Sequence, residues 1–253
     1  MLGNIRVAVR CVALATVTFG FYGVRLALLL FTFAFRKADR GLMRFLFKRW
    51  ARTCARIVGM RITVVGRPPK PPFFLVTNHL TYLDGLTLGS QFGCVFIAKS
   101  EIASWPIIGF LAKQVSVIFV NREKRSDTLR VNTEIVEALA EGEGVVMFAE
   151  STTSRGTEVC AFKTALFESA ARNNLPVHYA SIHYDALPGA PPPSEWITWW
   201  TPISFGAHAL RVLRQSGLYA RVTFGETPIL ATDRKLLAEQ THAAVQSIFD
   251  PVD

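Results

Sequence analysis

The stretch "LVTNHLTYLDGLTLG", residues 75–89, contains a histidine and an aspartate five positions apart, His79 and Asp84. It passes from an apolar segment typical of a buried strand, through a polar turn, into a second apolar segment. A turn that leads into a helix can bring the Asp84 carboxylate back to the imidazole. A carboxylate on one ring nitrogen fixes the tautomer and leaves the other nitrogen available as a general base. The alternative is structural: Asp84 caps the helix and His79 is an incidental turn residue.

Strand-type and helical segments, which must position this pair, alternate along the chain. Residues 73–77 form the strand-type segment before His79, and the clearest helical patterns lie at 126–142, 160–173 and 232–249. Such alternation predicts an α/β fold with a largely parallel mixed sheet flanked by helices. In such sheets the chemistry lies at the carboxyl ends of the strands, where His79 would stand. The strand-type segments are 61–65, 73–77, 94–98, 115–120, 145–149, 177–182, 197–200 and 220–224.

Positive charge is concentrated at the amino terminus. Residues 1–56 hold eleven Lys and Arg and one acid, Asp39, whereas the whole chain carries +9. The remaining 197 residues therefore carry a net charge of −1. Because the basic segment is built around hydrophobic runs, it fits an anionic membrane surface better than nucleic acid, and we expect no nucleic-acid partner.

The hydrophobic runs at 11–24 and 26–35 are separated only by Arg25. They predict a membrane-anchoring helical segment over residues 1–60, followed by a catalytic domain over 61–253. The anchor is either a single span or a shallow re-entrant pair broken at Gly20, Gly23 and Arg25. A secretory signal peptide is the alternative, although no small-residue cleavage site is clear.

A basic stripe follows the hydrophobic runs. At helical spacing, apolar residues lie opposite the stripe, which predicts an interfacial helix whose cations face anionic lipid. The alternative is a solvated basic face on an ordinary packing helix. The stripe comprises Arg40, Arg44, Lys48, Arg52 and Arg56.

Other chemistries find little support in the sequence. The four cysteines have no C-x-x-C pairing, and His178 and His183 have no Cys or carboxylate at metal-ligand spacing. No G-x-S-x-G turn is present, which argues against a serine hydrolase. We therefore expect neither a metal nor a cofactor.

An ordered set of blocks resembles the glycerolipid acyltransferase family, which includes the 1-acylglycerol-3-phosphate acyltransferases. The resemblance covers about residues 72 to 228, and four ordered blocks are more specific than any one. The blocks are "NHLTYLD", "AKSEIASWPIIGFLAKQVSVIFVNR", "VVMFAESTTSRG" with "FKTALFESA", and "LPVHYASI". In the last block, Pro176 would start a strand near the acyl-donor region.

The resemblance implies roles for individual residues. His79 would be the general base that takes the proton of an acceptor hydroxyl, and Asp84 would orient it. The acceptor oxygen would attack the thioester of acyl-CoA or acyl-carrier protein directly. Lys99 and Arg122 match basic positions that would bind the polar head of the acceptor. We expect the enzyme on the cytoplasmic face of the inner membrane.

The third block departs from the family pattern F-P-E-G-T-R-S. Glu150 and Thr152 are retained, and the resemblance assigns residues 150–153 to substrate binding. Ser151 replaces a glycine, and Thr153 replaces the arginine that would help to hold a phosphomonoester. Either the acceptor has a different head group, or the protein is a catalytically silent lipid-binding protein on the same fold. Arg155, two residues away, is a candidate substitute for the missing arginine.

A branch that resembles lyso-ornithine-lipid acyltransferases fits the third block better, since its pattern is E-G-T-T-S-x-G. The segment "WWTPISFGAH", residues 199–208, strengthens this similarity, although the acidic turn usual after the tryptophans is absent. Taken alone, Trp199 and Trp200 are interpreted as core or membrane-interface aromatics, and His208 as a structural histidine. The expected acceptors are lyso-ornithine lipid or 1-acylglycerol-3-phosphate.

Overall fold

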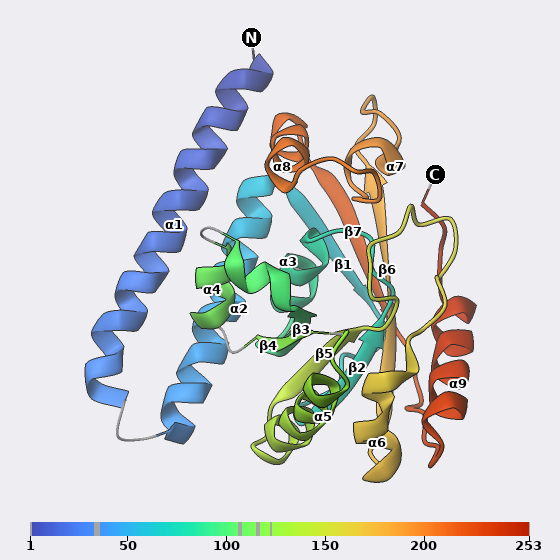
Figure 1. Ribbon diagram of the computed structural model, residues 1–253. Helices are drawn as coiled ribbons and strands as arrows, with labels where there is room; N and C mark the ends of the chain where they lie inside the picture. The colour runs from blue at the N-terminus through green and yellow to red at the C-terminus, as the bar shows by residue number, and fades with distance from the viewer. Residues whose placement is uncertain (1, 33–35, 106–107, 115–116, 122, 253) are drawn as a thin grey trace.

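A computed structural model describes residues 2–32, 36–105, 108–114, 117–121 and 123–252. These residues form a seven-stranded sheet in the order β1-β7-β6-β2-β5-β3-β4. All neighbouring strands are parallel except β6 and β7. The largely parallel mixed sheet is therefore confirmed (Figure 1). The strands are β1 (Met60–Val65), β2 (Phe73–Thr77), β3 (Val95–Lys99), β4 (Ile118–Val120), β5 (Gly144–Phe148), β6 (Val177–Ala186) and β7 (Leu218–Phe224).

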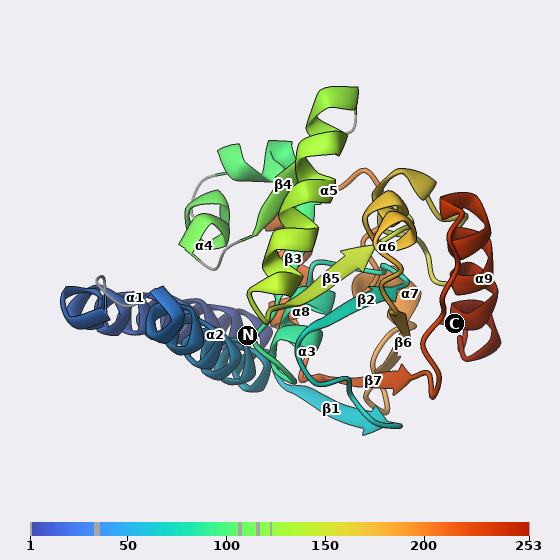
Figure 2. The ribbon, with the colours of Figure 1, turned by 90° about the horizontal axis from the view of Figure 1, so that it is seen from below.

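Helices cover both faces of the sheet (Figure 2). They are α1 (Leu2–Thr32), α2 (Arg36–Val58), α3 (Leu83–Gly89), α4 (Ile108–Gln114), α5 (Arg125–Ala140), α6 (Glu168–Arg172), α7 (Pro193–Trp196), α8 (Phe205–Arg214) and α9 (Arg234–Ser247), with short 3₁₀ turns η1 (Ser100–Ser104) and η2 (Thr164–Phe167).

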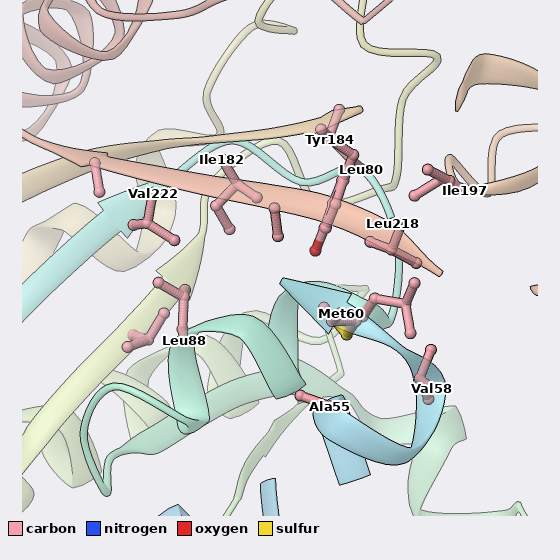
Figure 3. Packing of buried hydrophobic residues seen from close by; sticks show 14 of the residues in the cluster. Ala55, Val58, Met60, Leu80, Leu88, Ile182, Tyr184, Ile197, Leu218 and Val222 are labelled. Atoms are coloured by element: carbon pink, nitrogen blue, oxygen red, sulfur yellow. The ribbon is translucent and has the colours of Figure 1, made fainter. Parts of the chain in front are cut away.

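The central strand β2 explains why its sequence is apolar throughout. Phe73 and Leu75 belong to a core cluster shared with α2, α3 and α8, while Phe74 and Val76 pack on the other face with α5, α6 and α9. Successive side chains of a strand point to opposite faces, so a sheet covered on both sides needs an uninterrupted apolar run. Figure 3 shows part of the first cluster.

Two sequence expectations about elements are wrong. Residues 197–200 form no strand but a turn after α7, in which Ile197 and Thr198 are buried and Trp200 is exposed. The helix expected at 160–173 begins only at Thr164, as η2 followed by α6. Helix α8 was not expected, since its ten residues hold only a short apolar pattern.

The first helix is continuous from Leu2 to Thr32 and does not break at Gly20, Gly23 or Arg25. Its segment Gly3–Leu28 is long and apolar enough to cross a membrane, and only 6% of its most apolar window is buried. It forms a hairpin with α2, joined by an ion pair of 2.8 Å between Arg25 and Asp39. The alternative of a re-entrant break is therefore not what the chain adopts.

Three of the five cations in the basic stripe of α2 contact the protein itself, whereas Arg56 is exposed, so the interfacial interpretation of the stripe stays a prediction. Arg40 pairs with Glu141 at 2.6 Å and Arg44 with Glu143 at 3.1 Å. Arg52 donates to the carbonyl of Ser90 at 2.9 Å. The complementary acids lie in the turn between α5 and β5, about a hundred residues away in the chain. Helical periodicity cannot reveal such a partner.

Candidate active site

Three adjacent strands deliver the predicted site residues to one edge of the sheet. β2, β5 and β3 are neighbours, and Thr77 is paired with Phe148 at the carboxyl ends of β2 and β5. His79 follows β2, residues 150–153 follow β5, and Lys99 ends β3. Three of the four sequence blocks therefore meet, because each follows the carboxyl end of one of three neighbouring parallel strands.

Asn78 fixes the point where the chain leaves the sheet. Its amide group donates to the carbonyl of Ile182 at 2.9 Å and accepts from the Ile182 amide at 2.7 Å. The side chain thus continues the ladder between β2 and β6 while the main chain turns away. His79, the next residue, starts from a rigid position.

His79 and Asp84 form the expected pair. The His79 Nδ1 lies 2.7 Å from Asp84 Oδ2, which also accepts from the amides of Leu80 at 2.8 Å and Thr81 at 3.1 Å. An ionised carboxylate only accepts, so Nδ1 carries the proton and Nε2 is left unprotonated. Asp84 does not cap α3, because the amides that it binds precede that helix.

Two further contacts hold the imidazole and the main chain of His79. It stacks on the Phe148 ring with centroids 4.1 Å apart and an interplanar angle of 19°. The carbonyl of His79 accepts from the Ser154 amide at 3.0 Å. The His79 side chain is 22% exposed while that of Asp84 is fully buried. Within the described chain, Nε2 has no hydrogen-bond partner. The imidazole is therefore oriented by buried groups, and its Nε2 is left without a partner in the described chain.

Glu150 lies beneath the His79 turn and does not line the cavity, so its role in substrate binding stays a prediction. Its carboxylate accepts from the amides of His79 at 2.8 Å and Cys160 at 3.2 Å. Glu150 is only 3% exposed, and its burial raises the pKa of the carboxyl group above its ordinary value. The residue supports the His79 turn through the main chain.

A cavity of about 1030 Å³ opens in front of His79. One wall comes from the hairpin, through Leu14, Phe21, Met43 and Trp50 among others. The opposite wall comes from the sheet edge, through Phe96, Phe148 and Lys99. His79 therefore borders a large and mainly apolar space bounded by the two amino-terminal helices.

The altered third block lines the cavity at Ser151, Thr152 and Thr153. Ser151 has a φ of 71°, the left-handed conformation that favours glycine, so the turn keeps the backbone of the family pattern despite the substitution. The Thr153 hydroxyl donates to the carbonyl of Trp199. Arg155 lies 5.5 Å from the centre of the Trp200 ring, and it is not among the residues that line the cavity.

Of the two basic residues expected at the acceptor head, the structure describes Lys99 but not Arg122. Lys99 lines the cavity and is exposed. Arg122 lies outside the described residues, so its contact with the acceptor stays a prediction. Lys99 is the cation that the described part of the sheet edge contributes.

An aromatic wall beside the base was not foreseen from the sequence. The rings of Tyr82, Trp105, Trp199 and Phe205 lie in contact, with the centroids of Tyr82 and Phe205 4.7 Å apart. His208 supports this wall, accepting from the Tyr82 hydroxyl at 3.2 Å and donating to the Thr198 carbonyl at 3.2 Å. His208 is thus structural, as expected, and burial lowers its pKa.

No group of three or more metal-ligating side chains occurs among the residues that the structure describes.

Comparisons with known proteins agree with this geometry. A family model described as Acyltransferase matches residues 61–182. A lyso-ornithine lipid O-acyltransferase of Brucella abortus is 32% identical over 98% of this chain and 95% of its own. A 1-acyl-sn-glycerol-3-phosphate acyltransferase of Neisseria gonorrhoeae is 36% identical over 47% of this chain and 48% of its own.

The fold is also that of a solved protein. The crystal structure of a 1-acyl-sn-glycerophosphate acyltransferase from Thermotoga maritima superposes with a TM-score of 0.57 at 18% identity, covering 94% of this chain and 97% of that one. A relative that is similar along nearly its whole length, a matching family model and a His79–Asp84 pair at the edge of the sheet lead to one conclusion: the chain belongs to the acyltransferase family.

Proposed function

We propose that this protein transfers a fatty acyl chain from a thioester, acyl-CoA or acyl-carrier protein, to the hydroxyl of lyso-ornithine lipid at a membrane surface. The observation that carries the proposal is the single cavity that joins the open nitrogen of His79 to the apolar hairpin. The names of the relatives support a lysolipid acceptor.

The residues suffice for direct transfer. His79 Nε2 takes the proton of the acceptor hydroxyl while the oxygen attacks the thioester carbon. The buried Asp84 carboxylate stabilises the imidazolium that forms. The tetrahedral intermediate then expels the thiolate, which receives the proton from His79. An ester bond replaces the thioester, and His79 returns to its starting state.

The cavity suits lipid chains. Its volume of about 1030 Å³ is at the upper end of the range of about 300–1,000 Å³ common for small-molecule sites. Its walls are largely apolar, with aromatic and aliphatic side chains from both hairpin helices. We assign the space between the hairpin and the sheet to acyl chains, because apolar chains gain free energy by leaving water there.

The head-group end favours an amino-acid lysolipid. A phosphomonoester carries close to two negative charges and is best held by forked cations. The position of the family arginine is instead Thr153, whose hydroxyl is engaged by Trp199. Lys99 matches one carboxylate, and the aromatic wall matches the side-chain ammonium of an ornithine head through cation–π attraction.

The membrane surface is proposed for the exposed side of α1. Ile5, Val9, Val12 and Phe19 are each at least 55% exposed, although large and apolar. A contiguous exposed apolar face marks a protein or membrane contact. We propose the cytoplasmic face of the inner membrane, where the thioester donors are available.

The silent lipid-binding alternative is less well supported. Its main argument was the altered third block, yet Ser151 adopts the conformation that the family glycine would have. His79 and Asp84 also retain a complete hydrogen-bond arrangement.

The test is an acceptor panel with the purified full chain in nanodiscs. Radiolabelled acyl-CoA and acyl-carrier protein are supplied with lyso-ornithine lipid, 1-acylglycerol-3-phosphate, and a lyso-ornithine lipid whose side-chain amine is acetylated. We expect the highest kcat/KM for lyso-ornithine lipid and a loss on acetylation. Absence of transfer to every acceptor would refute the proposal, and equal rates with both amine forms would refute the ammonium contact.

A further inference from the structure

Tyr184 is a buried tyrosine whose hydroxyl reaches the catalytic carboxylate. It lies on β6 with no exposed surface and extends inward among the core residues (Figure 3). Its hydroxyl donates to Asp84 Oδ1 at 2.8 Å. Thr87 Oγ1 lies 3.0 Å from the same hydroxyl. The fourth sequence block runs directly into this strand and thereby acquires a connection to the chemistry.

The contacts of Asp84 divide between its two oxygens. Oδ2 accepts from His79 Nδ1 and from two main-chain amides, while Oδ1 accepts from Tyr184. Among the described residues, Tyr184 supplies the side-chain contact to Oδ1. Because a phenol has one proton and gives it to Asp84, Thr87 must be the donor to Tyr184. The donors form a chain, Thr87 to Tyr184 to Asp84, that ends behind the base.

We propose that Tyr184 is a positioning residue that sets the basicity of His79 through Asp84. The hydrogen bond fixes the plane of the carboxylate so that Oδ2 faces Nδ1. It also draws negative charge toward Oδ1, away from the imidazole. In a fully buried site this polarisation is strong, because solvent does not screen it. The proposal deepens the proposed function and rests on it for its kinetic test.

The sign of the effect follows from the direction of the donor. Without the tyrosine proton, Asp84 keeps more charge at Oδ2 and stabilises the imidazolium more strongly. His79 then loses its proton at a higher pH. Since the neutral imidazole is the active form, the acidic limb of kcat/KM moves to higher pH, and the rates converge above that limb.

Tyr184 stays a donor at the pH of the assay, since burial and the neighbouring Asp84 raise the pKa of its phenol well above the ordinary value. Other ionisable groups face the same imidazole or its cavity and are unchanged by a Tyr184 variant. They are Glu150 beneath it, Lys99 and Glu101 from the β3 end, Tyr22 and Arg25 from α1, Cys54 from α2, and Tyr82 from the turn. Cys160 contacts Glu150, and His208 contacts Tyr82.

The test compares Tyr184→Phe with Tyr179→Phe, a tyrosine on the same strand whose hydroxyl makes no hydrogen bond to the described chain. The pH profile of kcat/KM is measured for wild type and both variants. For Tyr184→Phe we expect an acidic limb shifted upward by about half to one pH unit and a several-fold loss of rate on that limb. KM for the acceptor stays unchanged, and Tyr179→Phe follows the wild type.

Two further measurements keep the inference testable. Thr87→Val removes the donor to Tyr184 and should shift the limb in the same direction by less, even where Tyr184→Phe folds poorly. An NMR titration of the His79 imidazole reports its pKa without turnover, so it separates this inference from a failure of the proposed function. A limb and a His79 titration that coincide with wild type in both variants would overturn the proposal.

Discussion

The Thr153 hydroxyl donates a hydrogen bond to the main-chain carbonyl of Trp199. This contact joins the altered third block to the turn that carries the two tryptophans, 46 residues further along the chain. A side chain that would bind phosphate in the family pattern is here used to hold a wall of the cavity. Thr153, which departs from the family pattern, and the turn that carries the tryptophans are therefore linked by one contact.

Thr153→Arg should move acceptor preference toward 1-acylglycerol-3-phosphate. The new guanidinium supplies a forked cation, and a gain of about 1.4 kcal/mol corresponds to a tenfold change in the ratio of kcat/KM values. Thr153→Val is the matched control, because it removes the hydroxyl without adding charge and should affect both acceptors alike. A wild type that prefers the phosphate acceptor, with Arg155→Ala abolishing this preference, would instead make Arg155 the substitute cation.

His79→Ala should lower kcat by a factor on the order of 10² to 10⁴, the usual contribution of a positioned base. Asp84→Asn should be impaired as well, since the imidazolium loses its carboxylate. Steady-state rates with a labelled donor measure both, with circular dichroism to establish folding. A folded His79→Ala protein with undiminished turnover would contradict direct base catalysis.

Ser151→Gly should stabilise the protein by about 1 kcal/mol, because the left-handed backbone of Ser151 penalises a side chain. Urea unfolding measures the difference. Asn174→Gly provides a comparison at the other described non-glycine residue with positive φ, 48°. Asparagine tolerates that conformation better, so its gain should be smaller. A loss of stability in Ser151→Gly would mean that the serine side chain makes a stronger contribution than its backbone costs.

Acid should destabilise the aromatic wall through His208. Burial lowers the pKa of folded His208, so the unfolded state takes up a proton first as pH falls through about 6.5. The stabilising contribution is complete above that value and decreases below it, by at most about 1.4 kcal/mol per pH unit for one proton. His208→Gln should show a smaller loss of unfolding free energy between pH 7.5 and 5.5. Equal losses in both proteins would place the effect elsewhere.

Val9→Asn and Phe19→Asn together should weaken membrane binding by at least tenfold. Both side chains are exposed on α1, and burying a large apolar side chain is worth about 1.5–3 kcal/mol. Vesicle sedimentation measures binding, and activity on dispersed acceptor should change little. Leu129→Asn with Leu236→Asn is the control, on the exposed surface of α5 and α9. Similar effects of the two pairs would argue against α1 as the contact.

Much of the architecture could be predicted from local patterns. The apolar run of β2 and the helical spacing of α5 and α9 depend on nearby residues alone, and the order of the motifs indicated the carboxyl edge. The proximity of His79 to Asp84 also follows from one short turn.

Features that depend on residues distant in the chain could not be predicted from local sequence patterns. In the sequence Arg44 has the pattern of a lipid-facing cation, but in the fold it forms an ion pair with Glu143. Glu150 resembles a ligand until its two oxygens are seen to bind main-chain amides. Tyr184 is a hundred residues from Asp84, and no spacing rule connects them. In each case the partner is supplied by the tertiary fold.

Hydrogen bonds join the amino-terminal part of α1 to the carboxyl end of α8. Arg10 donates to the carbonyls of Leu213 at 3.1 Å and Gln215 at 2.6 Å, and Arg6 donates to that of Arg214 at 2.8 Å. These guanidinium groups satisfy the carbonyl end of α8, the helix that begins at Phe205 beside the base. With α1 at a bilayer, as proposed above, the tilt and depth of α1 would also determine the height of the cavity mouth above the lipid plane. A thicker or thinner bilayer should therefore change which hydroxyl along a lipid molecule lies at the depth of His79.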